Sequence, residues 1–240
     1  MQKYKRVLVK LSGEALAGKT CSSFNNDVVN NIAKQLIELT KSGIQVCVVI
    51  GGGNFWRGRT SGDMDRTSAD HIGMLATVMN AIYVSDTCKR LGAEAVVQTP
   101  FSVGTMTELF SKTTALKHLN DNKILFFAGG TGHPFFSTDT GAALRGCEVE
   151  VDILLFAKNI DGVYDSDPKL NPSAVKYERI SAKEFLVGNL KAIDSSCATL
   201  CMDNDLSIIV FDLGIENGIV RVANGEALGT TIYNLGGPRR

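Results

Sequence analysis

The sequence has no net charge, because its 25 Lys and Arg residues are balanced by 25 Asp and Glu residues. No basic stretch follows a groove-sized pattern, so there is little electrostatic support for nucleic-acid binding, and we expect no nucleic-acid partner. Copies of a chain without net charge repel one another only weakly, which is compatible with an oligomer.

The sequence also lacks an apolar run long enough to cross a membrane. The basic start, Met1–Arg6, precedes an apolar segment that Lys10 interrupts and that is too short for a signal peptide.

The six cysteines lack paired spacing, and no second pair or histidine cluster joins Cys197 and Cys201 in a zinc site. We therefore expect buried, reduced thiols, a cytoplasmic location and no membrane partner.

The 240 residues suffice for one large α/β domain or two closely fused lobes. Short apolar runs alternate with helical patterns along the chain. The expected strands are near 5–11, 44–50, 93–98, 123–128, 151–157, 175–180, 206–211 and 230–234, and the expected helices are near 27–40 (capped by Asp27), 68–91, 105–119, 138–148 and 214–222, with two more short helices before residue 206. This alternation predicts an α/β fold with a mainly parallel sheet covered by helices on both faces.

Glycine is concentrated where the expected strands end. Ser12-Gly13, Gly51–Gly53, Gly129–Gly132 and the segment Lys158–Asp167 all follow strands. Ligands of parallel sheets bind beyond the carboxyl ends of the strands. Three consecutive glycines expose backbone N–H groups to a phosphate, and Arg57 can add a bidentate contact. A tight turn is the alternative interpretation of the triple glycine.

Lys10 lies near the end of the first expected strand, inside an otherwise apolar run. One interpretation is a strand-edge lysine that reaches solvent. The other places its ammonium group over a phosphoryl group in transfer, with Gly13 allowing the backbone to approach phosphates closely.

Residues Gly13–Thr20 match the P-loop pattern GxxxxGK[ST], in which Lys19 would hold phosphates and Thr20 a magnesium ion. A P-loop opens directly into a helix, but the segment 21–26 (CSSFNN) is a poor helix start, and the first good cap is Asp27. We therefore interpret the match as accidental.

Three motifs together resemble the amino-acid-kinase family, which includes carbamate, acetylglutamate and aspartate kinases and bacterial uridylate kinases. They are Val9–Glu14 (VKLSGE), Gly51–Asn54 (GGGN), and Asp161–Tyr164 (DGVY) with Asp167-Pro168. The resemblance implies a three-layer sandwich of the amino-acid-kinase (carbamate-kinase-like) type.

Further segments are similar to the uridylate kinases of that family. Asp70–Asn80 (DHIGMLATVMN) resembles their D-H-x-G-M-L-A-T-V-M-N helix, and Thr131–Asp139 (TGHPFFSTD) resembles their T-G-N-P-[FY]-F-[ST]-T-D loop. Both motifs are highly specific. Asp203-Asn204, Gly225-Glu226 and Gly229-Thr230 fit the C-terminal portion, so the resemblance covers nearly the full chain.

The resemblance implies transfer of the γ-phosphoryl group of ATP to UMP, an early step of pyrimidine nucleotide biosynthesis, by a single domain over 1–240. Residues 1–150 would form the UMP-binding and oligomerisation lobe, and 151–240 the ATP-binding lobe. The implied ATP contacts are Lys10, Leu11, Ser12, Gly13, Gly53, Arg57, Lys158, Asn159, Tyr164 and Asp167. The implied UMP contacts are Gly52, Asp70, Thr131, Gly132, His133, Pro134, Phe135, Phe136, Ser137 and Thr138.

Within this set, Lys10 would span donor and acceptor, Tyr164 would pack on adenine, and Asp70 would accept hydrogen bonds from the ribose of UMP. Without the surrounding motif, Asp70 would be interpreted as a plain acidic residue at a helix N-terminus. His133 replaces the usual Asn of the loop expected to read uracil, and 19–26 lacks the glycine-containing sequence that many members use for GTP activation.

The expected catalytic residues are Lys10, Arg57 and Asp139. The UMP phosphate is already an anion, so catalysis requires positioning and charge neutralisation rather than a general base. The expected cofactor is Mg²⁺ carried by ATP, without a metal site of the protein's own. Asp139 and Asp152 are candidates to orient Lys10 or the magnesium shell, and Asp152 could instead cap a strand.

Two alternatives stay open: a kinase for a small carboxylate or carbamate, and a non-catalytic nucleotide- or oxyanion-storage protein on the same scaffold.

The expected helix 70–90 also carries more apolar side chains than one sheet face need cover: Ile72, Leu75, Met79, Ile82 and Tyr83. Ordinary core packing explains that pattern equally well, but the family resemblance implies a homo-oligomer, by analogy a hexamer.

The two lysines give a test. Replacing Lys10 with Ala should lower kcat at least about a hundredfold, because one donor to the transition state is lost. Lys19→Ala should leave kcat within about threefold, because we expect Lys19 to be solvated. Steady-state kinetics of both variants check this, and the reverse pattern would restore the P-loop interpretation.

Overall fold

The computed structural model describes residues 4–18, 23–56 and 62–234. Its strands are β1 Arg6–Leu11, β2 Gln45–Ile50, β3 Ala95–Thr99, β4 Glu108–Leu109, β5 Ile124–Phe127, β6 Ile153–Lys158, β7 Val163–Tyr164, β8 Lys176–Tyr177, β9 Arg179–Ser181, β10 Ile208–Asp212 and β11 Thr230–Tyr233. Its helices are α1 Gly13–Ala17, α2 Asn26–Lys41, α3 Arg66–Arg90, α4 Lys112–Asn120, α5 Thr138–Glu148, α6 Ala182–Val187, α7 Ser195–Asp203 and α8 Gly218–Ala223.

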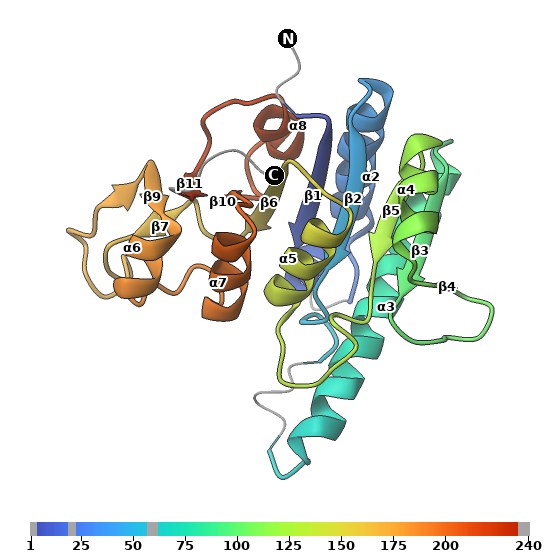
Figure 1. Cartoon of the computed structure of the whole chain (residues 1–240), viewed down its shortest axis with the longest axis horizontal. Helices are drawn as coiled ribbons and strands as arrows, with labels where there is room; N and C mark the ends of the chain where they lie inside the picture. The colour runs from blue at the N-terminus through green and yellow to red at the C-terminus, as the bar shows by residue number, and fades with distance from the viewer. Residues whose placement is uncertain (1–3, 19–22, 57–61, 235–240) are drawn as a thin grey trace.

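A nine-stranded sheet in the order β4-β3-β5-β2-β1-β6-β10-β11-β9 forms the middle of the molecule (Figure 1). Its neighbouring strands are parallel except for β10 and β11. The predicted α/β fold with a mainly parallel sheet is therefore confirmed. Strands from 1–150 and from 151–240 meet in this one sheet, because β1 pairs with β6.

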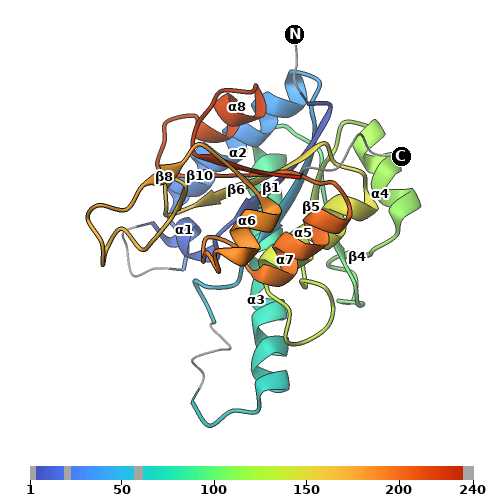
Figure 2. The same cartoon turned by 60° about the vertical axis from the view of Figure 1, so that its left-hand side comes forward.

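Helices cover both faces of the sheet. Figure 2 shows α2 and α8 on one side and α5, α6 and α7 on the other. On the side of α2 and α8, Ile32 and Leu36 of α2 are buried in the core. On the side of α5, α6 and α7, Ala142 of α5 and Phe185 of α6 are buried in the core. The near-continuous apolar sequences of β2 and β6 follow from this, because their side chains are buried on both faces.

The alternation of side chains along β1 places Lys10 toward α5. Leu8 packs in the core beneath α5, and Lys10, two residues later, shares that face of the sheet.

Unlike the helices that cover the sheet along their length, the long helix α3 extends beyond the sheet with its N-terminal half in both views (Figures 1 and 2).

Several local predictions are corrected. The helix expected at 105–119 begins only at Lys112, because 108–109 forms the edge strand β4 beside β3. Two hydrogen bonds hold this edge strand in place. Phe110 N donates to Thr99 O (2.8 Å), and the hydroxyl groups of Thr99 and Thr107 bond to each other (2.7 Å). The strand expected at 175–180 is two strands, β8 and β9. The helix expected at 214–222 begins only at Gly218.

The P-loop alternative is excluded by α1. Residues Gly13–Ala17 form a helix that Gly18 ends with a φ of 61°, whereas a P-loop needs an open loop there. Lys19 and Thr20 lie outside the described residues. The cap of α2 is Asn25 rather than Asp27, because its Oδ1 accepts hydrogen bonds from the backbone N atoms of Asp27 and Val28.

Asp152 caps β1 and lies at the opposite end of that strand from Lys10. Its Oδ2 accepts hydrogen bonds from Lys5 N (2.6 Å) and Arg6 N (2.7 Å). The hypothesis that Asp152 orients Lys10 or a magnesium shell is therefore wrong, and the strand-cap interpretation is confirmed.

The five described cysteines are free thiols, and all except the half-buried Cys147 are buried. Burial raises the pKa of Cys47 and of Cys88 to about 12, so these two thiols stay protonated and unreactive. Over the described ranges, no helix is long and apolar enough to cross a membrane.

Candidate active site

Two glycine loops at the carboxyl ends of β1 and β2 are packed directly against each other. A Cβ atom on Gly13 would overlap Gly51 O and would lie 2.8 Å from Gly53 N. A Cβ on Gly52 would lie 2.8 Å from Ala76 Cβ and from the carbonyl oxygen of Gly73 on α3. Close packing of backbone on backbone therefore requires glycine at 13 and 52, whatever ligand binds there.

Polar side chains of α3 hold these loops. Asn80, which is fully buried, donates from Nδ2 to Gly51 O (2.6 Å) and to Asn54 Oδ1 (2.8 Å). Thr77 Oγ1 accepts a hydrogen bond from Gly129 N (2.8 Å), which fixes the loop that follows β5. One helix thus positions the loops that leave β2 and β5.

A cavity of about 440 Å³ opens between these loops. Most of the predicted phosphate and UMP contacts line it: Lys10, Ser12, Gly13, Gly52, Gly53, Asp70, Thr131, His133, Phe136, Ser137, Thr138 and Asp139. Gly51 and Gly130, from the glycine loops expected at the site, also line it, and the remaining lining residues were not predicted as site residues: Glu14, Trp56, Arg66, Gly73, Met74, Thr77 and Asp194.

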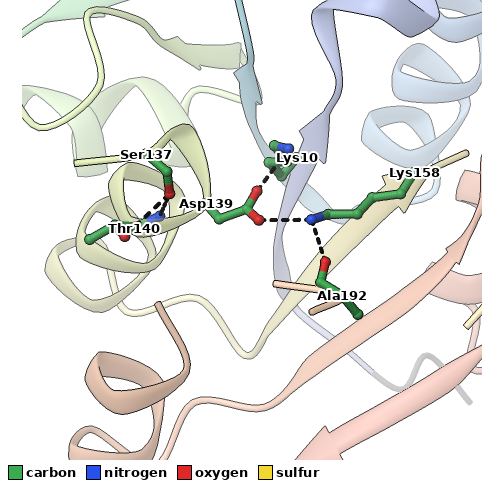
Figure 3. Close-up of polar contacts among 6 residues, drawn as sticks. All are labelled: Lys10, Ser137, Asp139, Thr140, Lys158 and Ala192. Carbon is green, nitrogen blue, oxygen red and sulfur yellow. Dashed lines mark hydrogen bonds and ion pairs between the residues drawn. The ribbon is translucent and has the colours of Figure 1, made fainter. Parts of the chain in front are cut away.

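Asp139, which lines this cavity, lies between two lysines (Figure 3). Its Oδ1 is 2.8 Å from Lys10 Nζ, and its Oδ2 is 2.7 Å from Lys158 Nζ. Lys10 is at the end of β1 and Lys158 ends β6, so the carboxylate joins two strands through the first turn of α5. Both ammonium groups also lie within 6 Å of the ring centroid of Phe156, which separates them from the core below.

The position of Asp139 follows from the cap of α5. Ser137 Oγ accepts a hydrogen bond from Thr140 N (3.2 Å), and the helix starts at the next residue, Thr138 (Figure 3). The positive end of the α5 dipole therefore faces the same space as the two lysines. This is an environment in which an anion is stabilised by charge and by backbone dipole together.

Electrostatics favour the ionised form of Asp139. Its burial alone would raise the pKa of the carboxyl group, but the charges of Lys10 and Lys158 outweigh that effect and hold the pKa below its ordinary value. Burial is also the largest influence on Lys158 and lowers the pKa of its ammonium group, and Asp139 offsets this only in part. The three groups carry one net positive charge in a nearly solvent-free place.

A second cavity of about 650 Å³ lies beyond the carboxyl end of β6, and predicted ATP contacts Asn159, Tyr164 and Asp167 line it. Lys158 lines neither cavity but contacts one lining residue of each, because its Nζ pairs with Asp139 of the first and donates to Ala192 O (2.6 Å) of the second.

Some predicted residues lie elsewhere. Leu11 is fully buried in the core, and Gly132, Pro134 and Phe135 belong to the loop after β5 but do not line the first cavity. Arg57 lies outside the described residues.

Sequence reasoning missed Asn80, Thr77 and Arg66. Asn80 and Thr77 are polar residues inside the helix motif Asp70–Asn80, and their polarity on a buried face was a usable signal. Arg66 lies four residues before Asp70, the spacing of an i,i+4 ion pair.

The structure is an α/β protein with a positively charged cluster beside a glycine-lined cavity, and residues 5–212 match the amino acid kinase family. The match covers well over half of the sequence. The chain belongs to the amino acid kinase family.

Solved structures of nucleotide kinases are similar over nearly the whole chain. UMP kinase from Bacillus anthracis has a TM-score of 0.93 and 35% identity, covering 99% of each chain. UMP kinase from Ureaplasma parvum has a TM-score of 0.91 and 34% identity over 96% of this chain and 99% of that one. Uridylate kinase from Archaeoglobus fulgidus has a TM-score of 0.73 and 26% identity over 94% and 99%.

The shared carboxylate predicts a pH-dependent loss of stability in Asp139→Asn. At pH 7 this variant should lose on the order of 3 kcal/mol, because two buried ammonium groups lose their counter-charge. The folded-state pKa of Asp139 is below the ordinary 3.8, so its contribution is complete above that pH and is lost as the pH falls through the folded-state pKa. Urea unfolding at pH 7 and near pH 3 should show the difference from wild type shrinking in acid.

Asp86→Asn is the matched control, because Asp86 pairs with Arg90 at 2.9 Å but both side chains are more than half exposed. This substitution should change stability by less than about 1 kcal/mol. An Asp139→Asn protein as stable as wild type at pH 7 would contradict the account of the lysine pair.

Proposed function

We propose that this protein is a UMP kinase that transfers the γ-phosphoryl group of ATP to UMP, giving UDP for pyrimidine nucleotide synthesis. The observation that carries the proposal is the Lys10–Asp139–Lys158 cluster, in which Lys10 and Asp139 line the first cavity and Lys158 contacts Ala192 of the second. The similarity to two UMP kinases at 34% and 35% identity over nearly full length supports it.

In this proposal the first cavity binds UMP and the second binds the nucleoside part of ATP. The lining of the first cavity comes from 10–139 except for Asp194, and that of the second comes from 159–212. This division supports a UMP lobe at about 1–150 and an ATP lobe at about 151–240. Asp70 would accept hydrogen bonds from the ribose of UMP, and Tyr164 would pack on adenine.

The chemistry required is charge neutralisation and alignment. The acceptor phosphate is already ionised, so the barrier arises from bringing two polyanions together. Lys10 at the end of β1 and Lys158 at the end of β6 can place ammonium groups on either side of the transferring phosphoryl group. Backbone N–H groups of the glycine loops and of the α5 N-terminus add fixed dipoles that need no reorganisation.

Asp139 would keep the two cations apart and correctly aimed. Without it, the ammonium groups would repel each other, and Lys158 would lose its proton more readily. The carboxylate itself need not contact a phosphate, because both of its oxygens already face ammonium groups. We therefore assign Asp139 a positioning role.

Magnesium fits this site as a partner of the nucleotide. Over the described ranges, no group of three or more His, Cys, Asp or Glu residues could hold a metal ion. Mg²⁺ binds well to phosphate oxygens with few protein ligands, so the triphosphate would supply most of its ligands. When bound, the ion would supply charge neutralisation on the phosphates.

A substrate panel tests the proposal. Purified protein with Mg-ATP should release ADP with UMP and much more slowly with CMP, dTMP, glutamate or aspartate. A coupled ADP assay measures this. Turnover of glutamate or aspartate instead would favour a small-carboxylate kinase, and nucleotide binding without any ADP release would favour a storage protein.

We also propose that the protein is a homo-oligomer, by family analogy a hexamer. Ile72, Leu75 and Met79 follow one another at helical spacing on α3 and are 37%, 51% and 47% exposed. Ile82 and Tyr83 do not belong to this surface, because they pack against the core. A continuous apolar face on a helix that extends from the sheet suits a second copy of the chain.

Light scattering coupled to size exclusion tests the oligomer. Wild type should elute with several times the mass of one chain, and Leu75→Glu with Met79→Glu should shift it toward the monomer because two charges would be buried in the interface. A wild-type protein that is only monomeric would overturn this proposal.

A further inference from the structure

Arg66 is the first residue of α3 and lines the first cavity, with its side chain 40% exposed. Its Nε atom donates a hydrogen bond of 2.8 Å to Asp70 Oδ2, one helical turn later. Its guanidinium carbon also lies 5.4 Å from the ring centroid of Phe135, in the loop that follows β5. Arg66 therefore contacts both the carboxylate and the loop beside it.

Asp70 is bound from two sides. Its Oδ2 accepts the hydrogen bond from Arg66 and a second one from Phe135 N (2.8 Å). Phe135 has a φ of 71°, an unusual backbone conformation for a bulky residue, so it needs contacts that hold it. The hydrogen bond to Asp70 and the cation–π contact with Arg66 are two such contacts.

This arrangement restricts how the carboxylate can turn. A free aspartate rotates easily about its side-chain bonds, but here one oxygen is fixed between a helix and a loop. A carboxylate is an acceptor with about four lone-pair sites, so it can still accept hydrogen bonds from a ligand in the cavity. The neighbouring hydroxyl groups of a ribose are donors of the kind that an oriented carboxylate binds.

We propose that Arg66 is a positioning residue that orients Asp70 toward the ribose of the acceptor nucleotide and thereby sets the preference for ribose over deoxyribose. This inference rests on the proposed function. Arg66 acts through Asp70 and need not touch the nucleotide. A deoxyribonucleotide lacks the 2′-hydroxyl group, so it gains less from an oriented carboxylate and loses less when that orientation is lost.

The test compares UMP with dUMP in Arg66→Gln. At saturating Mg-ATP, the ratio of kcat/KM for UMP to that for dUMP should fall about tenfold, roughly the contribution of one hydrogen bond to a charged group. The fall should come from a higher KM for UMP. The KM for ATP should stay within about twofold, because the ATP cavity is separate.

Arg90→Gln is the matched control. Arg90 is on the same helix and makes the same i,i+4 contact through Nε with Asp86 Oδ2 (2.9 Å), but it lies outside the cavity. A purely helix-stabilising role would make both variants behave alike. We expect Arg90→Gln to keep the wild-type ratio of UMP to dUMP.

Arg66→Lys provides a second route if Arg66→Gln does not fold. Lysine keeps the charge but not the planar guanidinium group, so the ratio should fall in the same direction by a smaller factor. An unchanged ratio in the folded variant, or an equal loss for UMP and dUMP, would overturn the role of Arg66. Wild-type protein that does not phosphorylate UMP at all would instead overturn the proposed function, so the two failures are distinguishable.

Discussion

One carboxylate shared by two lysines organises the site. Asp139 holds the ammonium groups of Lys10 and Lys158 at 2.8 and 2.7 Å, in a place where all three side chains are largely removed from water. Two such cations without an anion would repel each other and would be costly to bury. Lys10 is the penultimate residue of β1 and Lys158 is the last residue of β6, so the same interaction joins two central strands to the N-terminus of α5. The net positive charge that remains is what a group of phosphates requires.

The glycine loops depend on that arrangement and on α3. Glycine at 13 and 52 is needed because backbone packs on backbone there, so these residues serve the fold as well as any phosphate. Asn80 and Thr77 then hold the loops after β2 and β5 from inside one helix, and Asp70 near the start of the same helix contacts the loop after β5 a second time, through Phe135. A shift of α3 would therefore move both of these loops, which line the first cavity, together.

Local patterns in the sequence predicted much of the fold and the place of the first cavity. Apolar runs located the central strands, the range 138–148 for α5 was correct, and glycine after strands located the cavity. Features that depend on distant partners were missed. β4 forms because 108–109 pairs with the edge of β3, and propensity favoured a helix there. The sequence also could not show that Lys158 meets Asp139, because that contact requires the register of β1 beside β6. The i,i+4 spacing of Arg66 and Asp70 was a local signal, but the contact of Arg66 with Phe135 depends on a loop 65 residues beyond Asp70.

The most direct test of the central claim is a crystal structure of the protein with UMP and a non-hydrolysable ATP analogue. The account predicts that the γ-phosphoryl group of the analogue and the phosphate of UMP both lie within about 4 Å, ion-pair distance, of Lys10 Nζ, with Lys158 on the ATP side and Asp139 still between the lysines. Density that places the two phosphate groups away from Lys10, or a Lys10 side chain turned away from both nucleotides, would contradict it.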